Sequence, residues 1–134
     1  MKTKVIGIGD NVCDKYYPAK IMYPGGQAMN FSVYAKMLGA DAAYMGVFGR
    51  DEDREFIMSN KGGIVNEHPL ELTKEDLDYI RTFKLIHTSC NGHLDGELHK
   101  LREAGVPISY DMSGRWNQEY YIETIGPQVD IAFA

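Results

Sequence analysis

The stretch from Gly25 to Asp51 reads GGQAMNFSVYAKMLGADAAYMGVFGRD, and it decides the fold. Two glycines open it, a helical pattern follows from about Ala28 to Leu38, and Gly39 ends that helix before an apolar strand over 43–48. Glycines adopt backbone angles closed to other residues and let a ligand approach the main chain closely. The first N–H groups of the following helix lack partners within the helix and favour hydroxyl oxygens and anions. The stretch therefore predicts a binding site where this helix begins.

The helix expected over 28–38 carries a stripe of apolar residues. Met29, Val33 and Met37 recur at helical spacing, with Tyr34 and Leu38 beside them. Such a stripe is typical of a helix face that packs against a hydrophobic core. We therefore expect this face to be buried in the core rather than to bind a cofactor.

The rest of the chain repeats the order strand, helix, strand. Helices are expected over 28–38, from Thr73 with Asp76 as its capping-box partner, around 94–103 and over 120–125. The aromatic stretch 15–24 suits an edge strand or a loop. Strands are expected over 4–9, 43–48, 84–89, 106–111 and 129–133. This order predicts an α/β fold with a Rossmann-like, mostly parallel sheet, helices on both faces and one domain over 1–134.

Polar side chains follow several of the expected strands. Asp10, Asn11 and Asp14 come after the first strand, Cys90 to His93 follow the strand over 84–89, and Asp111 ends the strand over 106–111. Ligands of open α/β sheets bind beyond the carboxyl ends of the strands, so we expect these side chains at one edge. A carboxylate there can accept hydrogen bonds from the hydroxyl groups of a ligand. The alternative is that Asp10 and Asn11 only cap a turn.

Composition excludes several classes of function. The net charge of −5 argues against a nucleic-acid partner, and the chain has no apolar run long enough to span a bilayer. The first ten residues read as a strand rather than a signal peptide. Two cysteines without metal-like spacing favour reduced thiols in a cytoplasmic protein. His93 and His99 are six residues apart, which does not fit one helical face, so no metal site is predicted.

The unit G-G-x-A-x-N, then L-G, then G-x-F-G-x-D resembles the first signature of the ribokinase-like (PfkB) carbohydrate kinases. The start I-G-D-N, followed by Asp14, is most similar to the fructoselysine 6-kinases of that family. The resemblance implies a ribokinase-like fold and transfer of the γ-phosphate of ATP, with Mg²⁺, to a hydroxyl of a sugar or sugar-amine adduct. It also implies that Asp14, Gly25, Gly26 and Asn30 hold the sugar hydroxyls.

Other positions follow from the same resemblance. Asp10 and Asn11 are neighbours that reach toward the substrate. Asp111 to Arg115 resembles the family's D-x-N-x-R stretch, although Ser113 replaces the usual asparagine, so Asp111 and Arg115 are expected to border the site near the phosphates.

The chain departs from the family pattern at two places. Asp53-Arg54 resembles a strand that family members reach only after the lid strands over the sugar, so a stretch is missing near Glu52/Asp53. Either these residues were deleted from the protein, or they are present in it and omitted from the printed sequence. We favour the second explanation. The G-A-G-D signature, whose aspartate is the family's catalytic base, does not occur either. The resemblance therefore implies the sugar-binding half of a kinase that forms homodimers through its lid. The alternatives are a non-catalytic sugar-binding module, including a truncated product, and a folding fragment without function.

Overall fold

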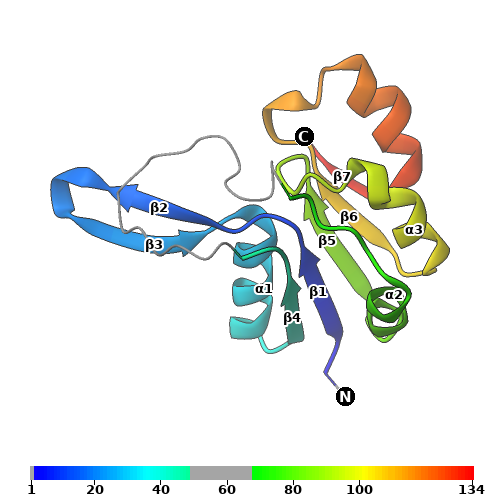
Figure 1. Cartoon of the computed structure of the whole chain (residues 1–134), viewed down its shortest axis with the longest axis horizontal. Helices are drawn as coiled ribbons and strands as arrows, with labels where there is room; N and C mark the ends of the chain where they lie inside the picture. The colour runs from blue at the N-terminus through cyan, green and yellow to red at the C-terminus, as the bar shows by residue number, and fades with distance from the viewer. Residues whose placement is uncertain (1, 49–67) are drawn as a thin grey trace.

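A computed structural model describes residues 2–48 and 68–134. Its main feature is a five-stranded parallel sheet in the order β4-β1-β5-β6-β7 (Figure 1). The strands are β1 (Lys4–Ile8), β4 (Asp41–Met45), β5 (Leu85–Ser89), β6 (Ile108–Asp111) and β7 (Ile131–Phe133). The predicted parallel α/β sheet is confirmed. β4 begins two residues before the predicted strand, and the missing stretch expected near Glu52/Asp53 lies outside the described residues.

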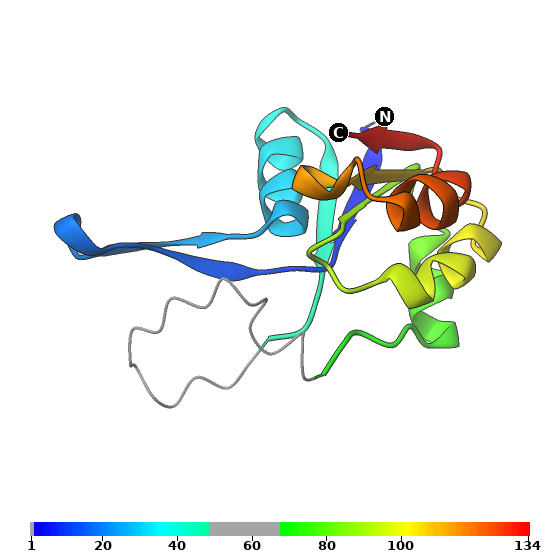
Figure 2. The same cartoon turned by 90° about the horizontal axis from the view of Figure 1, so that it is seen from above.

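Helices cover both faces of the sheet, as predicted. Helix α1 (Gln27–Met37) packs on one face against β1, β4 and β5. Figure 2 shows α1 on one side of β1 and the remaining helices on the other side. These are α2 (Lys74–Ile80), α3 (Leu98–Glu103) and η5 (Tyr121–Ile125), with the short turns η3 (Asp95–Glu97), η4 (Ser113–Arg115) and η6 (Gly126–Gln128). The predicted capping box at the start of α2 is present, since Thr73 and Asp76 exchange hydrogen bonds.

The hydrophobic core lies between the sheet and the α2–α3 side. Ile6 and Ile8 of β1, together with Ile86, Ile108 and Tyr110 of the neighbouring strands, are fully buried there. Because side chains alternate along a strand, these residues share one face of the sheet. The helix residues that the sequence aligned for this face, Leu94, Leu98 and Leu101, are also fully buried.

Helix α1 contacts the opposite face through small residues. The N–H of Gly7 donates to Ser32 Oγ at 3.2 Å, and Ser32 Oγ donates to the Ala43 carbonyl at 2.8 Å. A Cβ at Gly7 would overlap the Ala28 carbonyl oxygen, so glycine in β1 is what lets the helix come this close. Ala28 and Ser32 are accordingly the buried residues of the helix.

The prediction that the apolar stripe of this helix packs into the core was wrong. Val33, Met37 and Leu38 are 50%, 75% and 90% exposed, and Tyr34 beside them is exposed as well. The reason is steric, because the close approach over Gly7 selects the small side chains for the sheet. Val33, Tyr34, Met37 and Leu38 are turned outward, whereas Phe31 keeps a contact with the sheet through His87 of β5.

A β-hairpin extends away from the body of the molecule in both views (Figures 1 and 2). It consists of β2 (Val12–Tyr16) and β3 (Ile21–Gly25), which pair antiparallel across the turn η1 (Tyr17–Ala19). The stretch 15–24, predicted as edge strand or loop, thus forms most of this hairpin. Several large apolar side chains of the hairpin are exposed, namely Tyr16, Ile21, Met22 and Tyr23.

No helix among the described residues is long and apolar enough to cross a membrane.

Candidate functional site

The strand order places a topological switch between β1 and β5. From β1 the chain adds β4 on one side through α1, and the later strands β5, β6 and β7 follow on the other side. In open α/β sheets, ligands bind in the crevice outside the carboxyl ends of the strands at such a switch. The residues after β1, the residues after β5 and the end of β6 meet here with the first turn of α1, which is the edge expected from the sequence.

Asp10, directly after β1, is buried and holds the start of α1. Its Oδ2 accepts the N–H of Gln27 at 2.8 Å, and its Oδ1 accepts the N–H of Ala28 and the Ser89 hydroxyl, both at 3.3 Å. The expectation of free N–H groups at this helix start is therefore corrected, since Asp10 takes the first two. The Asp10 carboxylate, which follows β1, thus caps α1. The N-terminus of a helix is a favourable place for a negative charge.

Asn11 also has structural partners. Its Nδ2 donates to Tyr44 Oη at 2.8 Å and to the Val47 carbonyl at 3.0 Å. The Tyr44 hydroxyl donates in turn to the Gly9 carbonyl at 2.8 Å. Burial raises the pKa of Tyr44, although the hydrogen bond from Asn11 opposes that rise, so the phenol stays protonated as a donor. Asn11 thus ties the segment after β4 to the end of β1.

Asp14 and Gly25 lie together on the hairpin. Asp14 is exposed on β2, and Gly25 is buried at the end of β3. A Cβ at Gly25 would collide with the Asp14 carboxylate, whose oxygens stand directly over the glycine backbone. Only glycine allows this arrangement. It leaves the exposed Asp14 carboxylate, an acceptor for hydroxyl groups, over the buried main chain of Gly25.

Gly26 is the N-cap of α1 and has φ of +105°. A Cβ here would lie 2.6 Å from the Asp10 carbonyl oxygen and 2.9 Å from Asn11 Cα, so both conformation and space require glycine. Asn30 lies one turn into the helix and is exposed, and its N–H donates to the Gly26 carbonyl at 2.8 Å. Its side-chain amide makes no hydrogen bond to the described residues and is open to a ligand.

Gln27 is the main residue that the sequence reasoning missed. Its Nε2 donates to Asp111 Oδ2 at 2.6 Å, and its Oε1 accepts from Asn91 Nδ2 at 2.8 Å. These bonds join the first turn of α1 to the ends of β5 and β6. Two features of the sequence could have identified Gln27. It directly follows the two glycines, and polar residues stand at the ends of β5 and β6.

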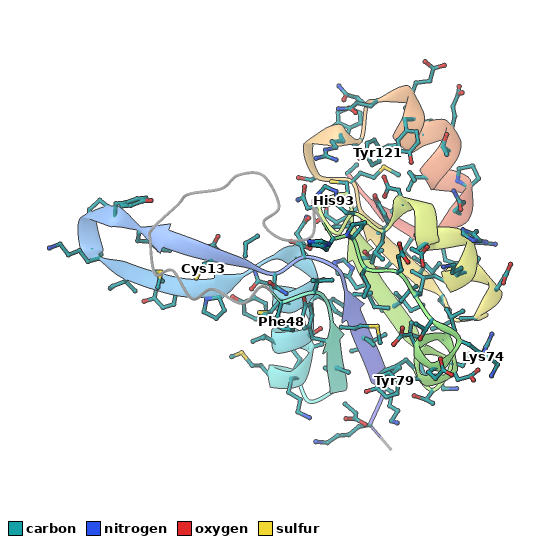
Figure 3. The ribbon with its side chains drawn as sticks, viewed as in Figure 1. Cys13, Phe48, Lys74, Tyr79, His93 and Tyr121 are labelled. Atoms are coloured by element: carbon teal, nitrogen blue, oxygen red, sulfur yellow. The ribbon has the colours of Figure 1, made fainter. Side chains whose placement is uncertain are left out.

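Asp111 and Arg115, the expected border of the site, lie on the same edge but are not paired with each other. Asp111 Oδ1 accepts the N–H of Ser113 at 2.7 Å, and Ser113 has φ of +50°. Arg115 Nη1 donates to the Cys90 carbonyl at 3.2 Å and to Tyr121 Oη at 2.8 Å. The hydrogen bond with Tyr121 raises the pKa of Arg115. Figure 3 shows Tyr121 beyond the loop that carries His93.

Burial favours the neutral forms of His87 and Cys90, two buried titratable groups near this edge. Burial lowers the pKa of His87, whose Nδ1 is 2.7 Å from Ser109 Oγ. Burial raises the pKa of the Cys90 thiol, which disfavours the thiolate needed for nucleophilic attack. Within residues 2–48 and 68–134, no three His, Cys, Asp or Glu side chains are grouped so that they could hold a metal ion.

The fold and the site together define an α/β protein with a cluster of hydrogen-bonded polar side chains at the switch of a parallel sheet. No protein-family model matches the sequence, and no solved structure matches it. The chain is 32% identical to the fructosamine kinase FrlD of Bacillus subtilis (strain 168) over 167 residues. The match covers 97% of this chain and 58% of the relative. The chain thus spans less than two thirds of the relative's length.

Proposed function

We propose that the protein is an ATP-dependent kinase that phosphorylates a hydroxyl of a fructosamine-type sugar, with fructoselysine as the leading candidate. The name of the similar Bacillus protein supports the kinase class and the sugar-amine substrate. The ribokinase-like signature around Gly25 and Gly26 supports the same class. The observation that carries the proposal is the exposed Asp14 carboxylate standing over the Gly25 main chain at the hairpin base.

The groups proposed to hold the sugar differ in their freedom to bind. Asp14 is an exposed acceptor, and the Asn30 amide is a donor and acceptor without a partner among the described residues. Gly25 and Gly26 contribute by their lack of a side chain, which leaves room for the Asp14 carboxylate and for the backbone of Asp10 and Asn11. Asp10 is engaged by three protein donors, so its contribution to sugar binding is indirect.

Among the described residues, Arg115 is a candidate contact for the ATP phosphates, whereas no carboxylate is assigned to Mg²⁺. In such kinases the bound nucleotide supplies the phosphoryl group and the metal neutralises charge that develops on it. The Asp10 and Asp111 carboxylates already accept hydrogen bonds from protein donors on both oxygens. We therefore assign neither of them to the metal. Arg115 lies at the edge and is the described cation closest in sequence to Asp111.

We further propose that residues 1–134 form the sugar-binding part of this kinase and that lid strands belong between β4 and α2. The match with the relative extends over 167 positions, more than the 134 residues of the chain, so it includes positions for which this chain has no residue. Among the described residues, the projecting hairpin β2–β3 pairs with no third strand, so its edges are where such strands would add. We also propose that the full-length protein forms a homodimer through the lid. A cytoplasmic location is part of the same proposal, because the two free thiols favour a reducing compartment.

The test begins with the intact mass of the purified protein and continues with a coupled ADP-release assay on fructoselysine, free fructose and ribose. We expect a mass above that of 134 residues and ADP release with fructoselysine. Sugar binding without ADP release would instead support the non-catalytic binding module. Absence of both would support the fragment without function.

The residue-level test is Asp14→Ala. Loss of a charged acceptor for a substrate hydroxyl should raise the KM for fructoselysine about tenfold or more. The KM for ATP should change little, because Asp14 lies on the hairpin. Asp78→Ala is the matched control, since Asp78 is an exposed aspartate on α2. An unchanged sugar KM in the Asp14 variant would remove Asp14 from the site.

A further inference from the structure

Gln27 connects the start of α1 to three strands of the sheet. Its backbone N–H donates to Asp10 after β1, at 2.8 Å. Its side chain reaches Asp111 at the end of β6 and Asn91 after β5, at 2.6 and 2.8 Å. Within the described part of the chain, no other residue of α1 makes side-chain hydrogen bonds to both of these strand ends. The turn formed by Gly25 and Gly26 directly precedes it.

The chemistry of the two side-chain bonds requires an amide. A carboxylate only accepts, so the group facing Asp111 must be a donor, whereas the group facing the Asn91 NH₂ must be an acceptor. The second Asp111 oxygen is taken by the Ser113 N–H, so the carboxylate cannot rotate to find another partner without losing that bond. Glutamine has a donor and an acceptor on one rigid plane, whereas leucine has neither and glutamate has no donor when ionised.

We propose that Gln27 is a positioning residue that fixes the Gly25–Gly26 turn, and with it the sugar site, against the ends of β5 and β6. The inference rests on the proposed function for its ligand. Asp10 alone anchors only the backbone of the first turn of the helix, and the side chain of Gln27 supplies the two further attachments. A site held in its binding geometry before the ligand arrives avoids the ordering cost on binding, so loosening this turn weakens sugar affinity.

Three variants of the full protein test the inference. Gln27→Leu removes both side-chain bonds at similar volume. Gln27→Glu places a second carboxylate against Asp111, where one shared proton would restore the donor. The double variant Gln27→Glu/Asp111→Asn exchanges the acid and the amide. In it, Asn at 111 donates to Glu at 27 and still accepts from the Ser113 N–H, and Glu at 27 still accepts from Asn91. Every bond is kept, and only the bond between 27 and 111 has its donor and acceptor exchanged.

The readouts are the Kd for fructoselysine by titration calorimetry and hydrogen exchange of the amides of residues 25–30 by mass spectrometry. We expect Gln27→Leu to weaken binding about tenfold and to speed exchange by a similar factor, because two hydrogen bonds are lost, one of them to a charged group. Gln27→Glu should show the same loss at pH 8 and recover toward wild type at about pH 5.5, since paired carboxylates bind a shared proton more tightly. The double variant should bind within about threefold of wild type at pH 8, its hydrogen bonds being retained.

Gln128→Glu is the matched control, because Gln128 makes one exposed hydrogen bond to the Thr124 carbonyl far along the chain. It should change neither readout. If wild type binds no fructoselysine, the proposed substrate fails, and the exchange experiment still decides whether Gln27 holds the turn. Unchanged exchange in Gln27→Leu overturns the inference. Faster exchange with unchanged Kd in a protein that binds fructoselysine also overturns it, since Gln27 would then support only the helix.

Discussion

At the scale of single residues, Asp10 and Asp14 are two carboxylates of the same chain segment with different surroundings. Asp10 is 4% exposed and accepts from two helix N–H groups and a hydroxyl. Asp14 is exposed and stands over Gly25. Burial and hydrogen bonding therefore assign Asp10 to the architecture of the site and leave Asp14 free to meet a ligand.

This difference predicts that alanine substitution lowers the free energy of unfolding much more at Asp10 than at Asp14. Asp10→Ala should lower the free energy of unfolding by about 2 kcal/mol, because it leaves buried donors without an acceptor and removes a helix cap. Asp14→Ala should change it by less than about 0.5 kcal/mol, as is usual at exposed positions. Urea unfolding followed by circular dichroism measures both. Equal losses in the two variants would contradict the assignment.

At the scale of elements, α1 is docked on the sheet by an aromatic contact as well as by its small residues. The Phe31 ring stacks on the buried His87 ring of β5, with centroids 4.5 Å apart and planes 23° apart. His87 also contacts Ser109 of β6 and lies edge-to-face with Phe133 of β7. The imidazole thus links α1 to three strands of the sheet.

Docking through His87 predicts a pH-dependent stability. Burial lowers the pKa of His87 in the folded protein, although the charges of Asp111 and Asp10 oppose the shift. Below the ordinary histidine pKa of about 6.5, the unfolded chain therefore binds more protons than the folded one, and stability falls as pH drops from about 7 to 5.

The measurement is the urea midpoint at a series of pH values for wild type and His87→Asn. Asparagine keeps a polar atom near the position of Nδ1 but does not titrate. The variant should be less stable at pH 7, because the ring contact with Phe31 is lost, and its stability should vary less with pH across this window. Parallel pH curves for the two proteins would show that His87 does not carry the dependence.

At the scale of the whole molecule, the two faces of the sheet are covered unequally. The α2–α3 side has a continuous buried core, whereas the outer side of α1 and the last strand of the sheet expose large apolar groups. Met37 and Leu38 are among the most exposed of them, and Ile131 and Phe133 of β7 are about half exposed. β7 also forms an edge of the described sheet. Exposed apolar faces and open strand edges promote association.

We therefore expect the 134-residue chain, expressed as printed, to self-associate in light scattering coupled to size-exclusion chromatography. The double variant Val33→Lys/Met37→Lys should shift it toward the monomer, because lysine at both positions removes apolar area and adds repulsion. Lys74→Ala/Lys84→Ala, on exposed positions of the other side, serves as a control. A wild-type monomer at every concentration would contradict this expectation.

Much of the architecture follows from local patterns in the sequence. Thr73 and Asp76 predict the start of α2 because a capping box is satisfied within one turn. Leu94, Leu98 and Leu101 predict a buried face, and strand-end rules place Asp111 at the carboxyl edge of the sheet. The two glycines at the start of α1 stand out in the sequence, but the atoms that leave no room for a Cβ there belong to Asp14, Asp10 and Asn11, which the fold brings to them.

Contacts between distant segments were decided only by the tertiary structure. The sequence shows an apolar stripe on α1, but the glycine in β1 turns that stripe outward by drawing Ala28 and Ser32 to the sheet. It shows Asp10 as a ligand candidate, but the helix that the carboxylate caps begins many residues later. Gln27 becomes important only when β5 and β6 bring Asn91 and Asp111 to it. Periodicity and caps are local and can be read along the chain, whereas hydrogen-bond partners depend on which strands become neighbours.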